Sequence, residues 1–341
     1  MKRFLTVLLA LSLMLTVLTG CGKEETPDTP QDTPKTNLVV YTSESQDLVT
    51  DMLEDFISKN PDITYTLFRS GTGKVTAKID TEREAGSVDA DVVWVADLGY
   101  LHRLDGEGMI HHYSSPAMEH LDARFNYNSG MAYEVRQIFN IIAYNTAVCP
   151  TVPADWIDLA DPALKGRAAM ANPSYSGGAL TTVLTHVSNP AIGWELYDSL
   201  IANDLKLEES HGNLQTKVSS GEYAAVSMVD FMARNAEHDG APVKTVWPAS
   251  GAVMVPTPVA ILEKDDPAVM AAAERFIDYL LSEDAQRLFS EQGYIPVDPA
   301  VASPEGAPAA SDIVTWPLDL DFFMNESSAV RDQFESMLER G

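Results

Sequence analysis

The stretch LVVYTSESQDLVTDMLEDFISKNPDITYTLF, residues 38–68, decides the fold. Its first five residues are apolar or β-branched and lie between polar residues, which predicts a short buried strand. Apolar side chains then recur at i, i+4 and i+8 over 46–59, which predicts a helix with one buried face that ends at Asn60-Pro61-Asp62. A second strand is expected at 63–68. Strands separated by a helix pair in parallel, so this unit predicts an α/β sheet.

The same alternation of strand and helix continues along the chain. Further strands are expected at 91–95, 135–144, 168–170 and 224–229, and further helices at 72–84, 98–105, 177–187, 194–203, 267–281 and 283–292. The segment 252–262 is strand-like but contains Pro256 and Pro258, which favours a crossing or edge segment over a central strand. The pattern predicts two α/β lobes, with the chain returning to the first lobe near Gly251.

The first residues indicate export. Lys2 and Arg3 precede an apolar run over 4–17, which is too short for a comfortable membrane span of about 20 residues. Residues 1–20 are therefore predicted to form a signal peptide. The ending Leu-Thr-Gly-Cys at 18–21 resembles the lipobox of bacterial lipoproteins, a resemblance that implies a diacylglycerol on Cys21 and a membrane anchor. The alternative is an ordinary signal peptide with a chance cysteine.

A polar segment separates this signal from the first strand. Residues 22–36 carry no large apolar side chain and three prolines, so they cannot bury enough surface to offset their ordering entropy. We expect residues 21–36 to form a disordered tether that holds the folded body away from a membrane surface. A linker without any role predicts the same disorder.

Composition limits the classes of partner and chemistry. The chain has 50 acidic and 23 basic residues and a formal charge of −27, which argues against a nucleic-acid partner and against attachment to anionic lipid through surface charge. With Cys21 lipidated, Cys149 has no partner for a disulfide. No Gly-x-Ser-x-Gly elbow, His-Glu-x-x-His or paired-cysteine spacing occurs, and the adjacent His111 and His112 point in different directions on regular structure. We expect no enzyme activity, no metal, no cofactor and a monomer.

Two glycine-rich loops precede predicted helices, one in each half of the chain. Glycines let the main chain approach a ligand, hydroxyls donate hydrogen bonds, and the start of a helix attracts an anion. The first loop, 69–74, is not a Walker A motif, because Phe68 and Val75 occupy the places of its first glycine and its Ser or Thr. The alternative is two ordinary helix caps with permissive glycines. The candidate residues of the two loops are Ser70, Gly71, Thr72, Ser174, Tyr175, Ser176, Gly177 and Gly178.

Two aspartates follow apolar runs at the expected carboxyl ends of strands. Asp230 follows 224–229, and Asp97 follows 93–96. A carboxylate at that position can bind an amine or the hydroxyls of a ligand. For each aspartate, a cap of the following helix is the alternative.

Several blocks, in order over about 38–300, resemble one known family. These blocks are LVVYTS (38–43), SGTG (70–73), ADVVW (90–94), PADWIDL (153–159), KGR (165–167), NPSYSGG (172–178), FIDYLLS (276–282) and GYIPV (293–297). They are similar to the ferric-iron, phosphonate and thiamine branch of type II periplasmic binding proteins.

This resemblance implies a two-lobed type II periplasmic-binding-protein fold with two crossover hinge strands, here near 137–143 and 251–258. The lobes would close around a solute by hinge motion. The closed protein would then dock on an ABC transporter permease with its cytoplasmic ATPase. The corresponding division is 37–142 for the first lobe, 143–250 for the second, and 251–341 for the return to the first lobe and the C-terminal helices.

The resemblance also bears on the ligand. Ferric-iron members place adjacent tyrosines after the strand that ends here near Val229, whereas this chain has Asp230-Phe231-Met232. Fe(III) prefers anionic oxygens, so iron binding is in doubt. Phosphonate-binding relatives carry an acidic residue and then an aromatic one at that place. The hypothesis is a small phosphonate or phosphate ester, with Ser43 and the two loops around the anion and Asp230 on an amine or hydroxyl. The alternatives are a ferric-iron carrier and a sensor lipoprotein that presents its ligand to a receptor.

Overall fold

The computed structural model describes residues 35–340. The predicted signal peptide, Cys21 and most of the predicted tether lie outside this range. Within it, no helix combines the length and the apolarity needed to cross a membrane.

The first lobe is built on a mixed sheet. β1 (Thr36–Thr42) pairs in parallel with β2 (Ile63–Arg69) on one side and β3 (Val92–Trp94) on the other, as the opening stretch of sequence predicts. Within residues 35–340 the sheet has seven strands in the order β2-β1-β3-β14-β6-β5, with β4 on β14. The strands beyond β3 are β4 (Ile110–His111), β5 (Asn126–Tyr127), β6 (Ala132–Tyr133) and β14 (Val259–Leu262).

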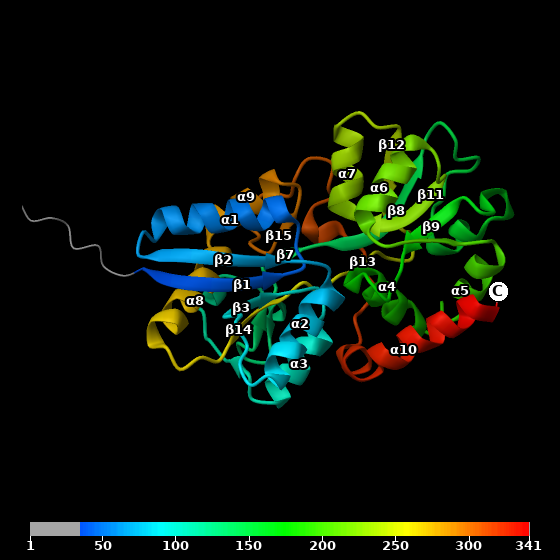
Figure 1. The fold of residues 1–341 in the computed structure, drawn as a ribbon. Helices are drawn as coiled ribbons and strands as arrows, with labels where there is room; N and C mark the ends of the chain where they lie inside the picture. Colours follow the sequence, from blue (N-terminus) through cyan, green and yellow to red (C-terminus); the bar gives the residue numbers. More distant parts are fainter. Residues whose placement is uncertain (1–34, 341) are drawn as a thin grey trace, which may run out of the picture. The chain divides into compact units, whose positions relative to one another are not determined.

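Helices cover both faces of this sheet, because successive side chains of a strand point to opposite faces. Leu38, Val40 and Trp94 pack with α1 (Gln46–Lys59), α8 (Pro267–Leu280) and α9 (Glu283–Glu291). Tyr41 and Val93 pack on the other side with α2 (Thr72–Glu84) and α3 (Leu98–Gly106). Figure 1 shows α1 and α9 on one side of β1 and β2, and α2 and α3 on the other.

The second lobe has its own sheet. Its order is β10-β9-β11-β8-β12, with β13 on β8. The strands are β8 (Phe139–Asn145), β9 (Ala168–Ala171), β10 (Lys206–Glu208), β11 (Ala225–Val229), β12 (Val243–Val246) and β13 (Val253–Met254). The helices are α4 (Gly177–Ser188), α5 (Glu195–Ala202), α6 (His211–Ser220) and α7 (Asp230–His238).

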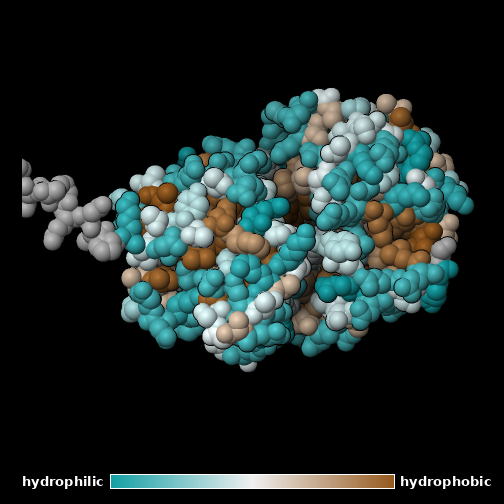
Figure 2. Space-filling model, viewed as in Figure 1, coloured by the Kyte–Doolittle hydropathy of each residue, from teal (hydrophilic) through white to brown (hydrophobic). Residues whose placement is uncertain are grey.

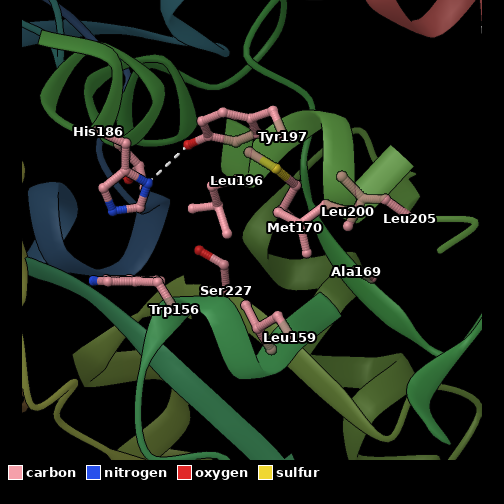
Figure 3. A pocket seen from close by; sticks show the side chains of 11 residues that line it. Trp156, Leu159, Ala169, Met170, His186, Leu196, Tyr197, Leu200, Leu205 and Ser227 are labelled. Carbon is pink, nitrogen blue, oxygen red and sulfur yellow. Dashed lines mark hydrogen bonds between the residues drawn. The ribbon is translucent and has the colours of Figure 1, made fainter. Parts of the chain in front are cut away.

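A small cavity lies in the core of the second lobe (Figure 3). Its volume of about 10 Å³ has room for roughly one water molecule. His186, Tyr197, Trp156 and Ser227 are among the side chains that line it. The imidazole Nδ1 of His186 lies 2.9 Å from the Tyr197 hydroxyl. This cavity is a packing defect of the core and is too small for an organic ligand.

The chain crosses between the lobes at 134–138 and at 255–258. The expected first crossing, 137–143, falls mostly within β8, and β8 belongs entirely to the second sheet, so the crossing comes a few residues earlier. The second crossing separates β13 from β14 and contains both prolines of 252–262. β7 (Arg136–Gln137) pairs with β15 (Ile295–Pro296) between the two sheets.

The last helix, α10 (Leu320–Arg340), joins both lobes. It packs against α4 and α5 of the second lobe and against α3 of the first, and Figure 1 shows it running along α4 and α5. We expected residues 251–341 to return to the first lobe, but β13 lies in the second sheet and α10 contacts both lobes. The sequence pattern also missed β10, α6 and β12.

Candidate ligand-binding cleft

A cleft of about 830 Å³ separates the two lobes. Figure 2 shows it as the hollow between the two halves of the body. Its lining comes from the segments after β1 and β2, the segments before α4 and α6, the start of α7 and the crossings. The walls therefore come from segments far apart in the sequence, which only the fold brings together.

The loop after β2 presents hydroxyls and amides to the cleft. α2 begins at Thr72 after Gly71, which has no side chain to cap the helix. Within residues 35–340 the Ser70 and Thr72 hydroxyls have no hydrogen-bond partner in the protein, and the main-chain amides of Thr72 and Gly73 have no acceptor. These donors lie at the positive end of the α2 dipole, which suits an anion.

The loop before α4 repeats this arrangement in the second lobe. Ser176 caps α4 by accepting a hydrogen bond from the Ala179 amide at 3.3 Å. Over the described part of the chain, the amides of Gly177 and Gly178 have no acceptor. Both loops line the same cleft, so two helix starts converge on one volume.

The two loops approach each other through their glycines. A Cβ on Gly177 would lie 2.0 Å from the carbonyl oxygen of Ala96, which belongs to the first lobe. Cβ atoms on Gly71 and Gly73 would lie 3.8 Å from the Tyr175 oxygen and 4.0 Å from the Ser174 oxygen. The main chains of the two lobes therefore touch beside the cleft.

Nine of the eleven candidate residues line the cleft. These are Ser43, Ser70, Gly71, Thr72, Ser174, Tyr175, Ser176, Gly177 and Gly178. The Ser43 hydroxyl also accepts a hydrogen bond from the Ala96 amide at 3.2 Å, which holds the end of β3 against β1. Ser174 donates to the Glu335 carboxylate of α10 at 2.5 Å.

Asp230 does not line the cleft. Its side chain is 1 % exposed and accepts hydrogen bonds from the Phe139 amide at 2.8 Å and from Arg234 at 2.6 Å. Arg234 in turn donates to the Gly293 oxygen at 2.6 Å. Burial raises the pKa of Asp230, while the charge of Arg234 opposes that rise. Both carboxylate oxygens bind the protein itself, so this aspartate holds the start of β8 instead of facing a solute.

Asp97 also lies outside the cleft. It caps α3 by accepting from the Tyr100 amide at 2.9 Å. The neighbouring Gly99 packs against the main chain of Met324 in α10. Burial raises the pKa of Asp97. Its position beneath α10 supports the capping alternative.

Sequence reasoning missed a buried cluster at the hinge side of the cleft. Glu44 lines the cleft and forms an ion pair with Arg136, which is fully buried in the first crossing. The guanidinium also lies 4.3 Å from the ring centroid of Tyr294, whose ring lies 4.2 Å from that of Phe231 at a tilt of 37°. The residues of this cluster come from four separate segments, so no local pattern could have revealed it.

His211 is a second residue of the cleft that the sequence did not reveal. It begins α6 after the cap Ser210, and its Nε2 lies 3.2 Å from the Ser176 hydroxyl. The signal was present in the sequence, since Ser210 precedes buried Leu214 and Val218 at helical spacing. The charged side chains of the cleft lining are Glu44, Arg69, Lys74 and Glu209.

The charge balance of the cleft differs from that of the chain. Arg69 and Lys74 offset Glu44 and Glu209 in number, and Arg136 pairs with Glu44 from behind. The cleft therefore offers an anion a nearly neutral, donor-rich environment in a strongly acidic protein.

No group of three or more His, Cys, Asp or Glu side chains within residues 35–340 could hold a metal ion. The adjacent histidines bind carboxylates outside the cleft: His111 contacts Glu263 and Glu274, whereas His112 contacts Asp105.

Comparison with known proteins assigns the class. The family model described as "Bacterial extracellular solute-binding protein" matches residues 90–317, so the chain belongs to this family of solute-binding proteins of ABC importers. Proteins of this family bind small solutes outside the cytoplasm and interact with a permease and its ATPase. The family consists of transport proteins, not of enzymes.

Two curated relatives carry the comparison further. An uncharacterized protein of Haemophilus influenzae is 28 % identical over 279 residues, which cover 76 % of this chain and 77 % of the relative. A putative 2-aminoethylphosphonate-binding periplasmic protein of Salmonella paratyphi A is 24 % identical over 268 residues, covering 76 % and 73 %.

Solved structures confirm the two-lobed type II periplasmic-binding-protein fold. AfuA from Actinobacillus pleuropneumoniae, with fructose-6-phosphate bound, has a TM-score of 0.81 and 21 % identity over 90 % of this chain and 100 % of that one. Iron-bound HitA from Pseudomonas aeruginosa has a TM-score of 0.77 and 16 % identity over 88 % and 99 %. At these identities the likeness is one of fold alone.

Proposed function

We propose that this protein captures a small phosphonate or phosphate ester between its lobes and delivers it to an ABC importer. The observation that carries the proposal is the convergence of two helix starts, α2 and α4, on one cleft, where the Ser70 and Thr72 hydroxyls and the first amides of both helices have no partner within residues 35–340. A phosphoryl group has several acceptor oxygens and a negative charge, and both suit these donors. The Salmonella relative named for 2-aminoethylphosphonate is consistent with this class of ligand.

The phosphoryl oxygens would contact Ser70, Gly71 and Thr72 from the first lobe and Ser176, Gly177 and Gly178 from the second. The positions of Ser43, Ser174 and Tyr175 in the lining support contacts to the remainder of the ligand. Asp230 is left out of this set because both of its oxygens bind the protein. Glu44 is the carboxylate of the lining best placed on the hinge side to meet an amine or a hydroxyl.

The first test is a thermal-shift screen of the chain without residues 1–20 and with Cys21→Ser, which prevents lipidation. The panel contains 2-aminoethylphosphonate, fructose 6-phosphate, inorganic phosphate, thiamine derivatives and ferric citrate. A ligand at a hundred times its dissociation constant should stabilise the protein by about 2.7 kcal/mol. A response to ferric citrate alone would overturn the phosphoryl ligand and leave the transport role standing.

Serine variants then connect the response to the two loops. Ser70→Ala and Ser176→Ala should each weaken binding of the phosphoryl compound about tenfold, because each removes a hydrogen bond to a charged group. The matched control is Ser87→Ala, an exposed serine outside the cleft. Unchanged affinity in both loop variants would contradict the proposed site.

We also propose that the protein acts as a monomer, tethered to the extracytoplasmic side of the cell membrane by a lipid on Cys21. The support is the order of basic start, short apolar run and Gly-Cys in residues 1–21. Metabolic labelling with a fatty acid should label the wild-type chain and leave Cys21→Ser unlabelled. Equal labelling of both would contradict the anchor.

A further inference from the structure

The Ser176 hydroxyl faces two groups at once. It caps α4 by accepting from the Ala179 amide at 3.3 Å, and it lies 3.2 Å from Nε2 of His211. A hydroxyl oxygen has two lone pairs and a single hydrogen. Which way that hydrogen points depends on whether His211 donates to Ser176 or accepts from it.

The surroundings of His211 favour donation from Nε2. Its Nδ1 is buried and, over the described part of the chain, has no hydrogen-bond partner. A hydrogen on Nδ1 would therefore be a buried donor without an acceptor, an arrangement that folded proteins rarely contain. The neutral form with its hydrogen on Nε2 leaves Nδ1 as an acceptor unpaired within residues 35–340 instead, which folded proteins tolerate better than an unpaired N–H, and it directs the hydrogen to Ser176.

The ring is also held in its neutral form. It lies at the start of α6 and beside the start of α4, where two positive dipole ends oppose a positive charge. Burial lowers the pKa of His211 to about 4. The acidic members of the cleft lining are Glu44, which pairs with Arg136, and the exposed Glu209.

We propose that His211 is a positioning residue that turns Ser176 into an obligatory hydrogen-bond donor to the ligand. The Ala179 amide and Nε2 of His211 donate to the two lone pairs of the Ser176 oxygen. Only the hydroxyl hydrogen is then left to form a further hydrogen bond, and it points away from both donors. The cleft then presents a directed O–H to an acceptor oxygen. This inference rests on the proposed function, since a phosphoryl group supplies such acceptors.

The position of the ring depends on Gly178. A Cβ on this residue would lie 3.3 Å from Nε2 of His211, closer than an ordinary contact. The glycine thus leaves room for the imidazole above the start of α4. A side chain there would push the ring away from the Ser176 hydroxyl.

The test is a double-mutant cycle with 2-aminoethylphosphonate and inorganic phosphate as probes, measured by calorimetry at pH 7.5. His211→Met removes the donor and keeps a side chain of similar length, and we expect about a tenfold loss of affinity. Ser176→Ala should lose about as much, and the double variant should lose no more than Ser176→Ala alone. His211→Gln, whose amide can donate to Ser176, should recover most of the affinity.

Nitrogen-15 NMR of the imidazole reads the same arrangement directly in the wild-type chain. We expect a neutral ring with its hydrogen on Nε2 at pH 7, before and after the probe binds. A hydrogen on Nδ1, a charged ring, wild-type affinity in His211→Met, or additive losses in the double variant would each overturn the inference. If the wild-type chain binds neither probe nor fructose 6-phosphate, the proposed function fails, while the NMR measurement still decides the orientation of Ser176.

Discussion

His186 is a titratable residue buried in the core of the second lobe. It is 1 % exposed, contacts Tyr197 through Nδ1, and packs edge to face with Trp156 at 4.8 Å between ring centroids. Figure 3 shows the imidazole beside the small cavity. Burial lowers the pKa of His186 to about 3, because the charged ring would lose its hydration.

This burial links stability to pH with a definite sign. Between pH 6.5 and 3 the unfolded chain binds a proton at this histidine and the folded protein does not, so the free energy of unfolding falls as the pH falls. The stability difference between wild type and His186→Gln should therefore shrink by on the order of 2 kcal/mol from pH 7 to pH 4.5.

Urea unfolding at both pH values measures this difference. Subtracting the free energy of unfolding of the variant from that of wild type removes the contributions of the buried carboxyls, which both proteins share. His238→Gln, whose side chain is 74 % exposed, controls for the loss of an imidazole. A difference that stays constant between the two pH values would contradict a neutral buried His186.

At the scale of elements, the start of α4 sets how closely the lobes approach. Gly177 lies against the Ala96 carbonyl, so a methyl group at this position must push the lobes apart. Gly73, in the opposite loop, has ordinary space for a Cβ at 4.0 Å from the Ser174 oxygen. Alanine variants of these two glycines therefore form a matched pair at the contact between the two loops.

Gly177→Ala should weaken binding of the phosphoryl ligand at least tenfold, about 1.4 kcal/mol, because the variant cannot reach the closed arrangement. Its ligand-free stability should be unchanged or slightly higher, since alanine favours a helix over glycine. Small-angle X-ray scattering with saturating ligand should give a larger radius of gyration than wild type, whereas Gly73→Ala should match wild type. A radius of gyration equal to that of wild type would contradict this expectation and would mean that the Ala96 segment moves aside for the methyl group.

At the scale of the whole described body, α10 holds the two lobes together from outside the cleft. It contacts α3 in one lobe and α4 and α5 in the other, and Glu335 accepts from the cleft residue Ser174. Phe334 anchors it in the second lobe, with 1 % exposure and its ring 5.5 Å from that of Tyr197. Hinge motion between the lobes must therefore shift the contacts of α10 with at least one of them.

Phe334→Ala should lower the free energy of unfolding by about 3 kcal/mol, the ordinary cost of removing a buried aromatic ring. Urea unfolding measures the effect. The exposed Asp332→Ala on the same helix should stay within about 0.5 kcal/mol of wild type. A loss below about 1 kcal/mol in Phe334→Ala would mean that α10 contributes little to the fold.

Local patterns in the sequence determined the strands and helices that open the first lobe, although they missed β10, α6 and β12 in the second. The helices at 46–59 and 72–84 have the bounds that their apolar spacing and end signals predict. The two glycine-rich loops were also recognisable, because hydroxyls and glycines before a helix form a short-range signal. Each of these features depends on neighbours within a few residues.

Tertiary structure alone decided which candidates meet at the cleft. Asp230 and Ser176 both stand at a strand–helix junction, yet the fold turns Asp230 toward the Phe139 amide and Arg234, and Ser176 toward His211 and the cleft. The Glu44–Arg136 pair and the contact of Gly177 with Ala96 join segments about 80 to 90 residues apart. Sequence spacing carries no information about such meetings, because they depend on how the two sheets and their crossings pack in space.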